Sequence, residues 1–191
     1  DLGVYGFRNR VDHTYDSLVV ADGSAIHAPR LWDVATRYGK PSIVVGVPGT
    51  YPPRPLNGVM VSCFLTPSRE SGFTYPPLLA REVEQVVGEY LFDCTNFRTD
   101  DKDDLLRQVY EMTDKRFRLA EHLLETKPWE LFALVEIGLD RMHHGFWKDL
   151  DDRHHRHQPG GPYADAILHY LRHLDTLIAR LLAYADEDTV V

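Results

Sequence analysis

The chain has 191 residues, of which 43% are hydrophobic and 26% charged. This composition excludes a disordered protein and is enough for one sizeable core, so we expect a single domain over residues 1–191. The 29 acidic and 21 basic residues give a net charge of -8. Because a phosphodiester backbone requires a basic surface, this balance argues against a nucleic acid polymer as partner.

Neither a long apolar segment nor a signal peptide is visible in the sequence, so we expect no membrane partner and a cytoplasmic location. Cys63 and Cys94 are too few and too far apart for a disulfide framework or a thiolate metal site, which predicts buried free thiols. The sequence gives no indication of the oligomeric state.

Helical and strand patterns alternate along the chain. Residues 29–39 have apolar side chains at helical spacing, with Pro29 near the start and Gly39 as the stop. Residues 41–47 and 58–64 are β-branched runs between Pro, Gly and Asn, as in buried strands. They enclose a proline-rich loop at 46–55, which we expect to be rigid.

The second half continues the alternation. Thr99, followed by several aspartates, predicts the cap of a helix that runs to about Thr126. Residues 129–137 predict a third buried strand, and 166–182 form an amphipathic helix expected to cover a sheet face. Residues 189–191 resemble the opening of a fourth strand. The predicted fold is therefore α/β, with a largely parallel sheet and helices on both faces.

The sharpest candidate for chemistry is the pair Asp140 and His144, directly after the strand predicted at 129–137. If a helix starts there, a carboxylate and an imidazole four residues apart face the same side and can bind one cation. Ligands of open α/β sheets bind beyond the carboxyl ends of the strands, which is where this pair falls. Spacing alone leaves open the alternative of an Asp near a helix start and a surface His.

The other histidines give weaker signals. A histidine-rich segment at 149–162 contains candidates for further ligands or for a proton shuttle, although a solvated loop fits it better: Asp151, Asp152, His154, His155 and His157. Single histidines elsewhere are expected to be structural: His13, His27, His122, His169 and His173.

The proline-rich loop suggests a substrate contact. Backbone N–H groups, the Thr50 hydroxyl and the Asn57 amide are candidates for binding an anion there, because a restricted loop loses little entropy on binding. Thr50 as a nucleophile would require an adjacent base or metal. A proline-stiffened connector without a binding role is the alternative.

Taken in order, these segments resemble the type I phosphodiesterase/nucleotide pyrophosphatase group of the alkaline phosphatase superfamily, and most closely its predicted phosphohydrolase/phosphomutase branch. The resemblance covers nearly the whole chain and rests on VYGFR at 4–8, VPGTYPP at 47–53, NGVMVS at 57–62, FLTP at 64–67, TYPP at 74–77 and DRMHHGFW at 140–147.

The resemblance implies an alkaline-phosphatase-like fold and a two-metal phosphohydrolase with a Thr or Ser nucleophile, using zinc or manganese on a small phosphorylated substrate. Asp140 and His144 match two metal ligands of the family, whereas the pattern supports no ligand role for His143. The family's nucleophile precedes the stretch that 4–8 resembles, and its Asp-His-Gly motif follows the strand that 189–191 resembles. We therefore expect an incomplete, internal part of a larger phosphohydrolase domain, inactive by itself.

Two alternatives stay open: a non-catalytic module that binds a ligand or partner, and a phosphomutase. In this superfamily specificity comes from inserted regions, and residues 67–126 are the candidate cap or insertion. Aromatic side chains of this segment are candidates for a stacking surface, with core packing as the more frequent role: Tyr75, Tyr90, Phe92 and Phe97.

Overall fold

The computed structural model describes residue 4, residues 6–14 and residues 16–191. Tyr5, in the motif at 4–8, lies outside the described residues. The chain forms two compact units: the first contains the residues up to Phe92 together with His122–Val135, and the second contains Asp93–Glu121 and Glu136–Val191. The predicted cap at 67–126 is thus divided between the units. The single domain expected from composition stays a prediction.

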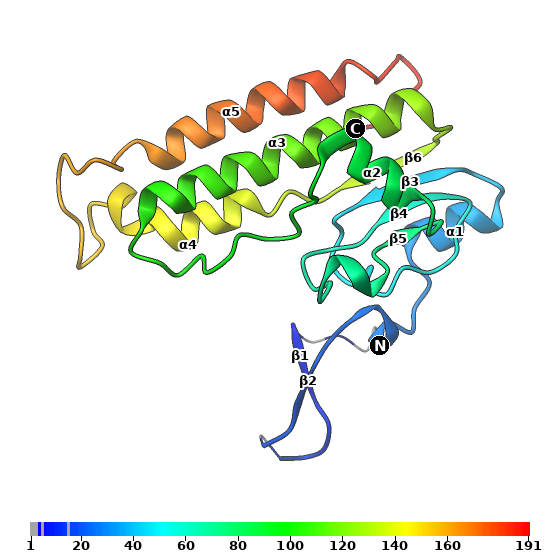
Figure 1. Ribbon diagram of the computed structural model, residues 1–191, viewed down its shortest axis with the longest axis horizontal. Helices are drawn as coiled ribbons and strands as arrows, with labels where there is room; N and C mark the ends of the chain where they lie inside the picture. Colours follow the sequence, from blue (N-terminus) through cyan, green and yellow to red (C-terminus); the bar gives the residue numbers. More distant parts are fainter. Residues whose placement is uncertain (1–3, 5, 15) are drawn as a thin grey trace. The chain divides into compact units, whose positions relative to one another are not determined.

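The first unit is built on a four-stranded sheet with the order β5-β4-β3-β6 (Figure 1). β3 pairs in parallel with β4 and β6, and β4 pairs antiparallel with the short β5. Ser42 lies opposite both Gly58 and Leu131, so the three parallel strands start level and their carboxyl ends share one edge. The strands are β3 (Ser42–Val45), β4 (Gly58–Val61), β5 (Thr74–Tyr75) and β6 (Leu131–Leu134).

Helices flank this sheet. All four residues of β3 are fully buried, as expected of a central strand apolar on both faces. Trp32 of α1 (Leu31–Arg37) packs in one cluster with Val44, Leu56 and Met60. Further buried side chains come from α2 (Leu79–Val87) and from the last turn of α3: Val83, Val87, Leu123 and Leu124. The predicted α/β class with a largely parallel sheet is confirmed.

Gly58 is required where β4 begins. Its φ is +131°, and a side-chain carbon at this position would collide with the backbone of Ser42 on the neighbouring strand. Only glycine lets the two strands start this close together.

The third predicted strand differs from the expectation. We predicted a buried strand over 129–137, whereas β6 covers only four residues, is half-buried and lies at the edge of the sheet. Among the described residues, none pairs with its outer side.

Smaller elements complete the first unit. An antiparallel hairpin joins β1 (Arg8–Arg10) and β2 (Leu18–Val20), and two short 3-10 helices follow, η1 (Gly23–Ala25) and η2 (Arg69–Ser71). Cys63 of this unit and Cys94 of the second unit are buried free thiols, as predicted. Within the part of the chain that the structure describes, no helix is both long and apolar enough to cross a membrane.

The second unit consists of helices that lie side by side (Figure 1). These are α3 (Lys102–Thr126, whose last turn belongs to the first unit), α4 (Gly138–Leu150) and α5 (Ala166–Leu182). Ion pairs Asp114–His173 and Glu121–Arg180, at 2.6 and 2.5 Å, link α3 to α5. The shared core is formed by fully buried side chains: Leu105, Val109, Met112, Phe117, Met142, Phe146 and Tyr170.

Three details of this unit correct the sequence prediction. The apolar stripe of α5 packs on the helices α3 and α4 of its own unit, as the contact of Tyr170 with Tyr110 illustrates. Asp101, not Thr99, caps α3, because α3 begins at Lys102 and the Asp101 carboxylate accepts from the Asp104 N–H at 3.1 Å. Residues 189–191 form no strand; the Thr189 hydroxyl instead donates to Asp186 in a local turn.

A buried polar cluster marks the start of α4. Glu136 Oε1 accepts hydrogen bonds from the Gly138 N–H and from the Thr113 hydroxyl, the latter at 3.2 Å. Its other oxygen lies 3.6 Å from Arg116, and the fully buried Tyr170 hydroxyl is 2.7 Å from that of Thr113. A carboxylate at a helix N-terminus is favourable, because it satisfies an N–H group that has no partner within the helix.

Gly138→Ala is expected to destabilise the second unit by about 1–3 kcal/mol, because the new methyl group would collide with Tyr170, Glu136 and Thr113 at once. Gly145→Ala on the same helix is the matched control, since its methyl group would meet one methyl group of Leu105 and no member of the polar cluster. Urea unfolding followed by circular dichroism measures both. Equal losses of stability would show that the cluster does not constrain the start of α4.

Candidate functional site

Helix α4 places Asp140 and His144 on one face. Asp140 lies in the first turn and His144 one turn later, and Asp140 Oδ2 is 3.6 Å from His144 Nε2. The two side chains are 52% and 51% exposed. Their donor atoms therefore converge at a point that a ligand can reach from solvent.

Arg141, which directly follows Asp140 in the sequence, connects Asp140 to a second carboxylate. Its Nε and Nη2 each donate to one oxygen of Asp93 at 2.6 Å, and its Nη1 donates to Asp140 Oδ2 at 2.5 Å. The Arg141 side chain is only 8% exposed. Burial opposes its charge, but the hydrogen bond and the charge of Asp93 outweigh this effect and raise the pKa of Arg141.

Phe97 contacts the two side chains that lie close to Asp140, those of Arg141 and His144. The Arg141 guanidinium carbon lies 4.2 Å from the centre of the Phe97 ring, within the range of a cation–π contact. The His144 ring centre lies 5.6 Å from the same ring. Sequence reasoning missed Asp93 and Arg141 altogether and named Phe97 only as a candidate for stacking or packing. The one signal in the sequence was that Arg141 directly follows Asp140, so that a positive side chain is expected beside this candidate ligand.

Cys94 lies next to Asp93 and is 8% exposed. Burial, together with the negative charge of Asp93, raises the pKa of its thiol to about 12. At neutral pH the group is therefore a thiol and not the thiolate that binds metals or attacks substrates.

Cys94 should react slowly with iodoacetamide in the folded chain. With a pKa of about 12, only about one thiol in ten thousand is ionised at pH 8, against about a quarter at an ordinary thiol pKa. Mass spectrometry of the Cys94 peptide should show alkylation at least a hundredfold slower than in chain unfolded with guanidinium. Comparable rates in both states would contradict the raised pKa.

The pair fits part of a divalent-metal site. Carboxylate oxygen and imidazole nitrogen are donors that zinc and manganese accept, and two such ligands on a tetrahedral zinc are about 3.3 Å apart. The observed 3.6 Å is close to this spacing. Within the described ranges, no group of three or more His, Cys, Asp or Glu side chains is arranged to hold a metal. The described residues thus offer two ligands and not a closed site.

The histidine-rich segment adds no ligand to this pair. The rings of His154 and His155 stack on each other with centres 4.5 Å apart, and His157 Nδ1 lies 2.9 Å from the Lys148 carbonyl. His143 contacts the ring of Trp147. Elsewhere, the ring nitrogens of His122 and His173 lie within hydrogen-bond distance of Glu82 and Asp114, at 2.8 and 2.6 Å.

Thr50 and Asn57 lie at opposite ends of the parallel strands, Thr50 beyond their carboxyl ends and Asn57 at their amino ends. Thr50 follows the carboxyl end of β3, is 3% exposed, and donates its hydroxyl hydrogen to the Val47 carbonyl at 2.6 Å. Asn57 directly precedes β4, and its amide donates to the Gly39 carbonyl at 2.8 Å. Both side chains thus have partners inside the chain, and their role in substrate binding stays a prediction.

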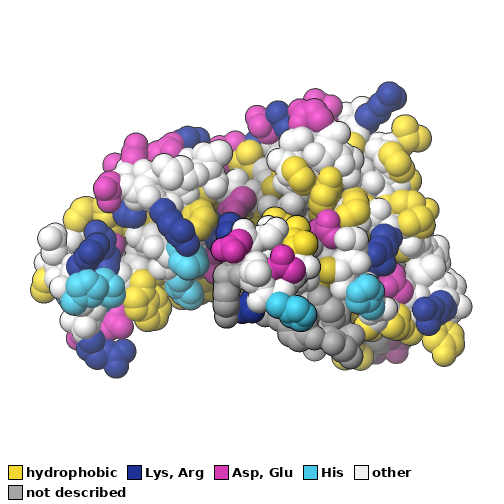
Figure 2. Space-filling view, turned by 90° about the horizontal axis from the view of Figure 1, so that it is seen from below, with side chains coloured by type: hydrophobic (Ala, Val, Ile, Leu, Met, Phe, Trp, Pro, Cys, Tyr) yellow, Lys and Arg dark blue, Asp and Glu magenta, His cyan; other side chains and the backbone are white. Residues whose placement is uncertain are grey.

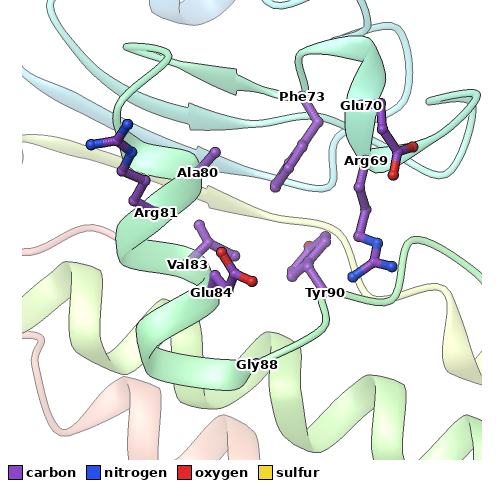
Figure 3. Close-up of a pocket in the computed structure, with 9 residues that line it drawn as sticks. All are labelled: Arg69, Glu70, Phe73, Ala80, Arg81, Val83, Glu84, Gly88 and Tyr90. Atoms are coloured by element: carbon purple, nitrogen blue, oxygen red, sulfur yellow. The ribbon is translucent and has the colours of Figure 1, made fainter.

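Three aromatic residues of the predicted cap form a packed cluster. Tyr90 stacks nearly parallel to Phe73 with ring centres 6.0 Å apart, and Phe92 meets both edge-on. Phe73 and Tyr90 also border a hollow of about 320 Å³ in the first unit, which Figure 3 shows between α2 and the segment around Arg69. Two arginines and two glutamates balance its charge: Arg69, Arg81, Glu70 and Glu84. None of the predicted site residues lines this hollow.

Acidic and basic side chains are interspersed on the face shown in Figure 2, where several histidines also reach the surface. This distribution agrees with the net charge of -8.

Fold and side-chain geometry together define an α/β protein with an acid–imidazole pair on the helix that follows a strand of a mostly parallel sheet. The chain belongs to the type I phosphodiesterase / nucleotide pyrophosphatase family, whose model matches residues 1–191. This membership is consistent with the predicted place in the alkaline phosphatase superfamily, and it indicates hydrolase activity of the phosphodiesterase or nucleotide pyrophosphatase type. Comparison with curated proteins and with solved structures gave no significant match.

Proposed function

We propose that Asp140 and His144 bind one divalent ion, zinc or manganese, in a phosphoric ester hydrolase whose complete site holds two ions. The observation that carries the proposal is the convergence of Asp140 Oδ2 and His144 Nε2 to 3.6 Å on an exposed helix face. Family membership of the whole chain supports the reaction class. The proposed substrate is a small phosphorylated molecule.

A bound divalent ion would stabilise negative charge on phosphoryl oxygens and favour deprotonation of an attacking hydroxyl. The chain's own residues prepare for this chemistry. Asp140 supplies a carboxylate oxygen, His144 supplies a ring nitrogen, and the helix fixes their spacing. Because both side chains are half exposed, a substrate can approach them from solvent.

The proposal assigns the nucleophile to a Thr or Ser outside this chain. Thr50, the one hydroxyl considered from the sequence, is buried and its hydrogen is donated to the Val47 carbonyl. Activating a hydroxyl requires a base or metal beside it, and the hydrogen bonds of Thr50 lead to backbone instead. A cytoplasmic location also stays a prediction.

Asp140→Ala and His144→Ala are each expected to weaken zinc binding to the chain at least tenfold, because each removes one of two ligands. Isothermal titration at pH 7 measures this loss. The chain has 10 histidines that could bind zinc weakly, so His143→Ala, one residue from the site, is the control and should bind as the wild type does. Unchanged affinity in both ligand variants would defeat the assignment.

The 191-residue chain should not hydrolyse bis(p-nitrophenyl) phosphate above background with zinc or manganese added, because the proposal places the nucleophile outside it. A colorimetric assay at pH 8 with the metals alone as blank tests this expectation. Robust turnover that disappears in Asp140→Ala would place a working nucleophile within these residues. Zinc binding without turnover supports the proposal.

A further inference from the structure

We infer that Asp93 and Phe97, acting with Arg141, are positioning residues that hold Asp140 and His144 in a metal-ready arrangement. This inference rests on the proposed function, because it concerns the same pair of ligands. All five residues belong to the second unit.

The geometry of the guanidinium group carries the first step. Arginine presents its N–H donors in one rigid plane, and Asp93 accepts from two of them at 2.6 Å each. A group held at two points cannot rotate, so the direction of the third nitrogen is also set. That nitrogen, Nη1, donates to Asp140 Oδ2 at 2.5 Å, and the half-exposed Asp140 is thereby fixed.

Burial makes this connection stronger than an ordinary surface ion pair. The side chains of Arg141 and Asp93 are 8% and 26% exposed, whereas the Arg107–Asp104 pair on α3 is largely open to solvent. Water screens an exposed pair and leaves it little net effect, but a buried charge-assisted fork is screened far less. Asp93 therefore holds the Arg141 guanidinium in one orientation.

The balance of charge explains why a second carboxylate is needed. Arg141 alone would neutralise Asp140 and leave no attraction for a cation. With Asp93 present, two negative charges face one positive charge, and the three groups keep a net charge of about −1 beside His144. This remaining charge favours a divalent cation at the Asp140–His144 pair.

Phe97 completes the arrangement. The same ring lies against the Arg141 guanidinium and the His144 imidazole, at 4.2 and 5.6 Å. A ring contact on this side restricts where the imidazole can turn. Asp93 and Phe97 both lie in the predicted cap, so this part of the cap supports the metal ligands.

The first test needs no metal. In the ¹H–¹⁵N NMR spectrum of the wild-type chain, the Arg141 Nε–H should give a resolved signal that exchanges slowly with water. Asp93→Asn should abolish its protection, and Phe97→Leu should weaken the nuclear Overhauser effects on the His144 ring. The control is Asp114→Asn, which breaks an ion pair to His173 in the same unit and should leave both observations unchanged.

The second test measures zinc affinity at this site alone, from the shift of the His144 ring signals during a zinc titration. Residues that orient metal ligands change affinity by about 10–100-fold, so Asp93→Asn should weaken binding by about tenfold. Arg141→Lys should act in the same direction, because one ammonium cannot bond both carboxylates as the fork does. Asp114→Asn should bind as the wild type does. Circular dichroism shows whether each variant is folded, and Arg141→Lys serves if Asp93→Asn is not.

The outcomes separate the two proposals. Wild-type affinity in both Asp93→Asn and Arg141→Lys, with weaker binding in Asp140→Ala, would overturn the positioning role and leave the metal ligands standing. An Arg141 Nε–H signal that Asp93→Asn leaves protected would overturn it without reference to metal. A His144 signal that does not respond to zinc in the wild type would instead remove the proposed metal site.

Discussion

The candidate site depends on one buried carboxylate, Glu136, which lies at the start of the helix that carries Asp140 and His144. By accepting from the Gly138 N–H, it fixes the residue at which α4 begins. Thr113, Tyr170 and Arg116 surround the same carboxylate, so it is tied to α3 and α5 as well. Once the start of a helix is fixed, the direction of every later side chain follows from 3.6 residues per turn. Asp140 and His144 face the same side for this reason.

The ion pair of Asp93 and Arg141 then restricts the side-chain orientations that the helix leaves open. Spacing on a helix brings two side chains near each other but leaves their rotamers free, and exposed side chains move among several rotamers. Asp93, through its fork with Arg141, and the Phe97 ring restrict that freedom, and both residues lie outside α4. The helix thus sets the approximate positions of Asp140 and His144. Contacts from Asp93 and Phe97, in the loop before α3, set the orientation of their side chains.

The sequence predicted the parts of the molecule that depend on neighbouring residues. The β-branched runs became β3 and β4, and the pattern over 166–182 matches α5. Asp140 and His144 were found because their spacing is local. Asp93 could not be found in this way, because 48 residues separate it from Arg141 and no periodicity links them. Glu136 was hidden for a similar reason, since it appeared as one acid inside an apolar run. The error at 189–191 shows that β propensity alone does not make a strand without a neighbour to pair with.

Both candidate ligands stand on one rigid helix, and this has a consequence for binding strength. After one donor has captured an ion, the other is already within reach, so the second bond forms within the same molecule at a high effective concentration. Such chelation costs little further ordering, because α4 brings the two donors close and the contacts with Arg141 and Phe97 already restrict them. The half-site also lies wholly within one compact unit. The distance between the two donor atoms is therefore set by that unit's own packing.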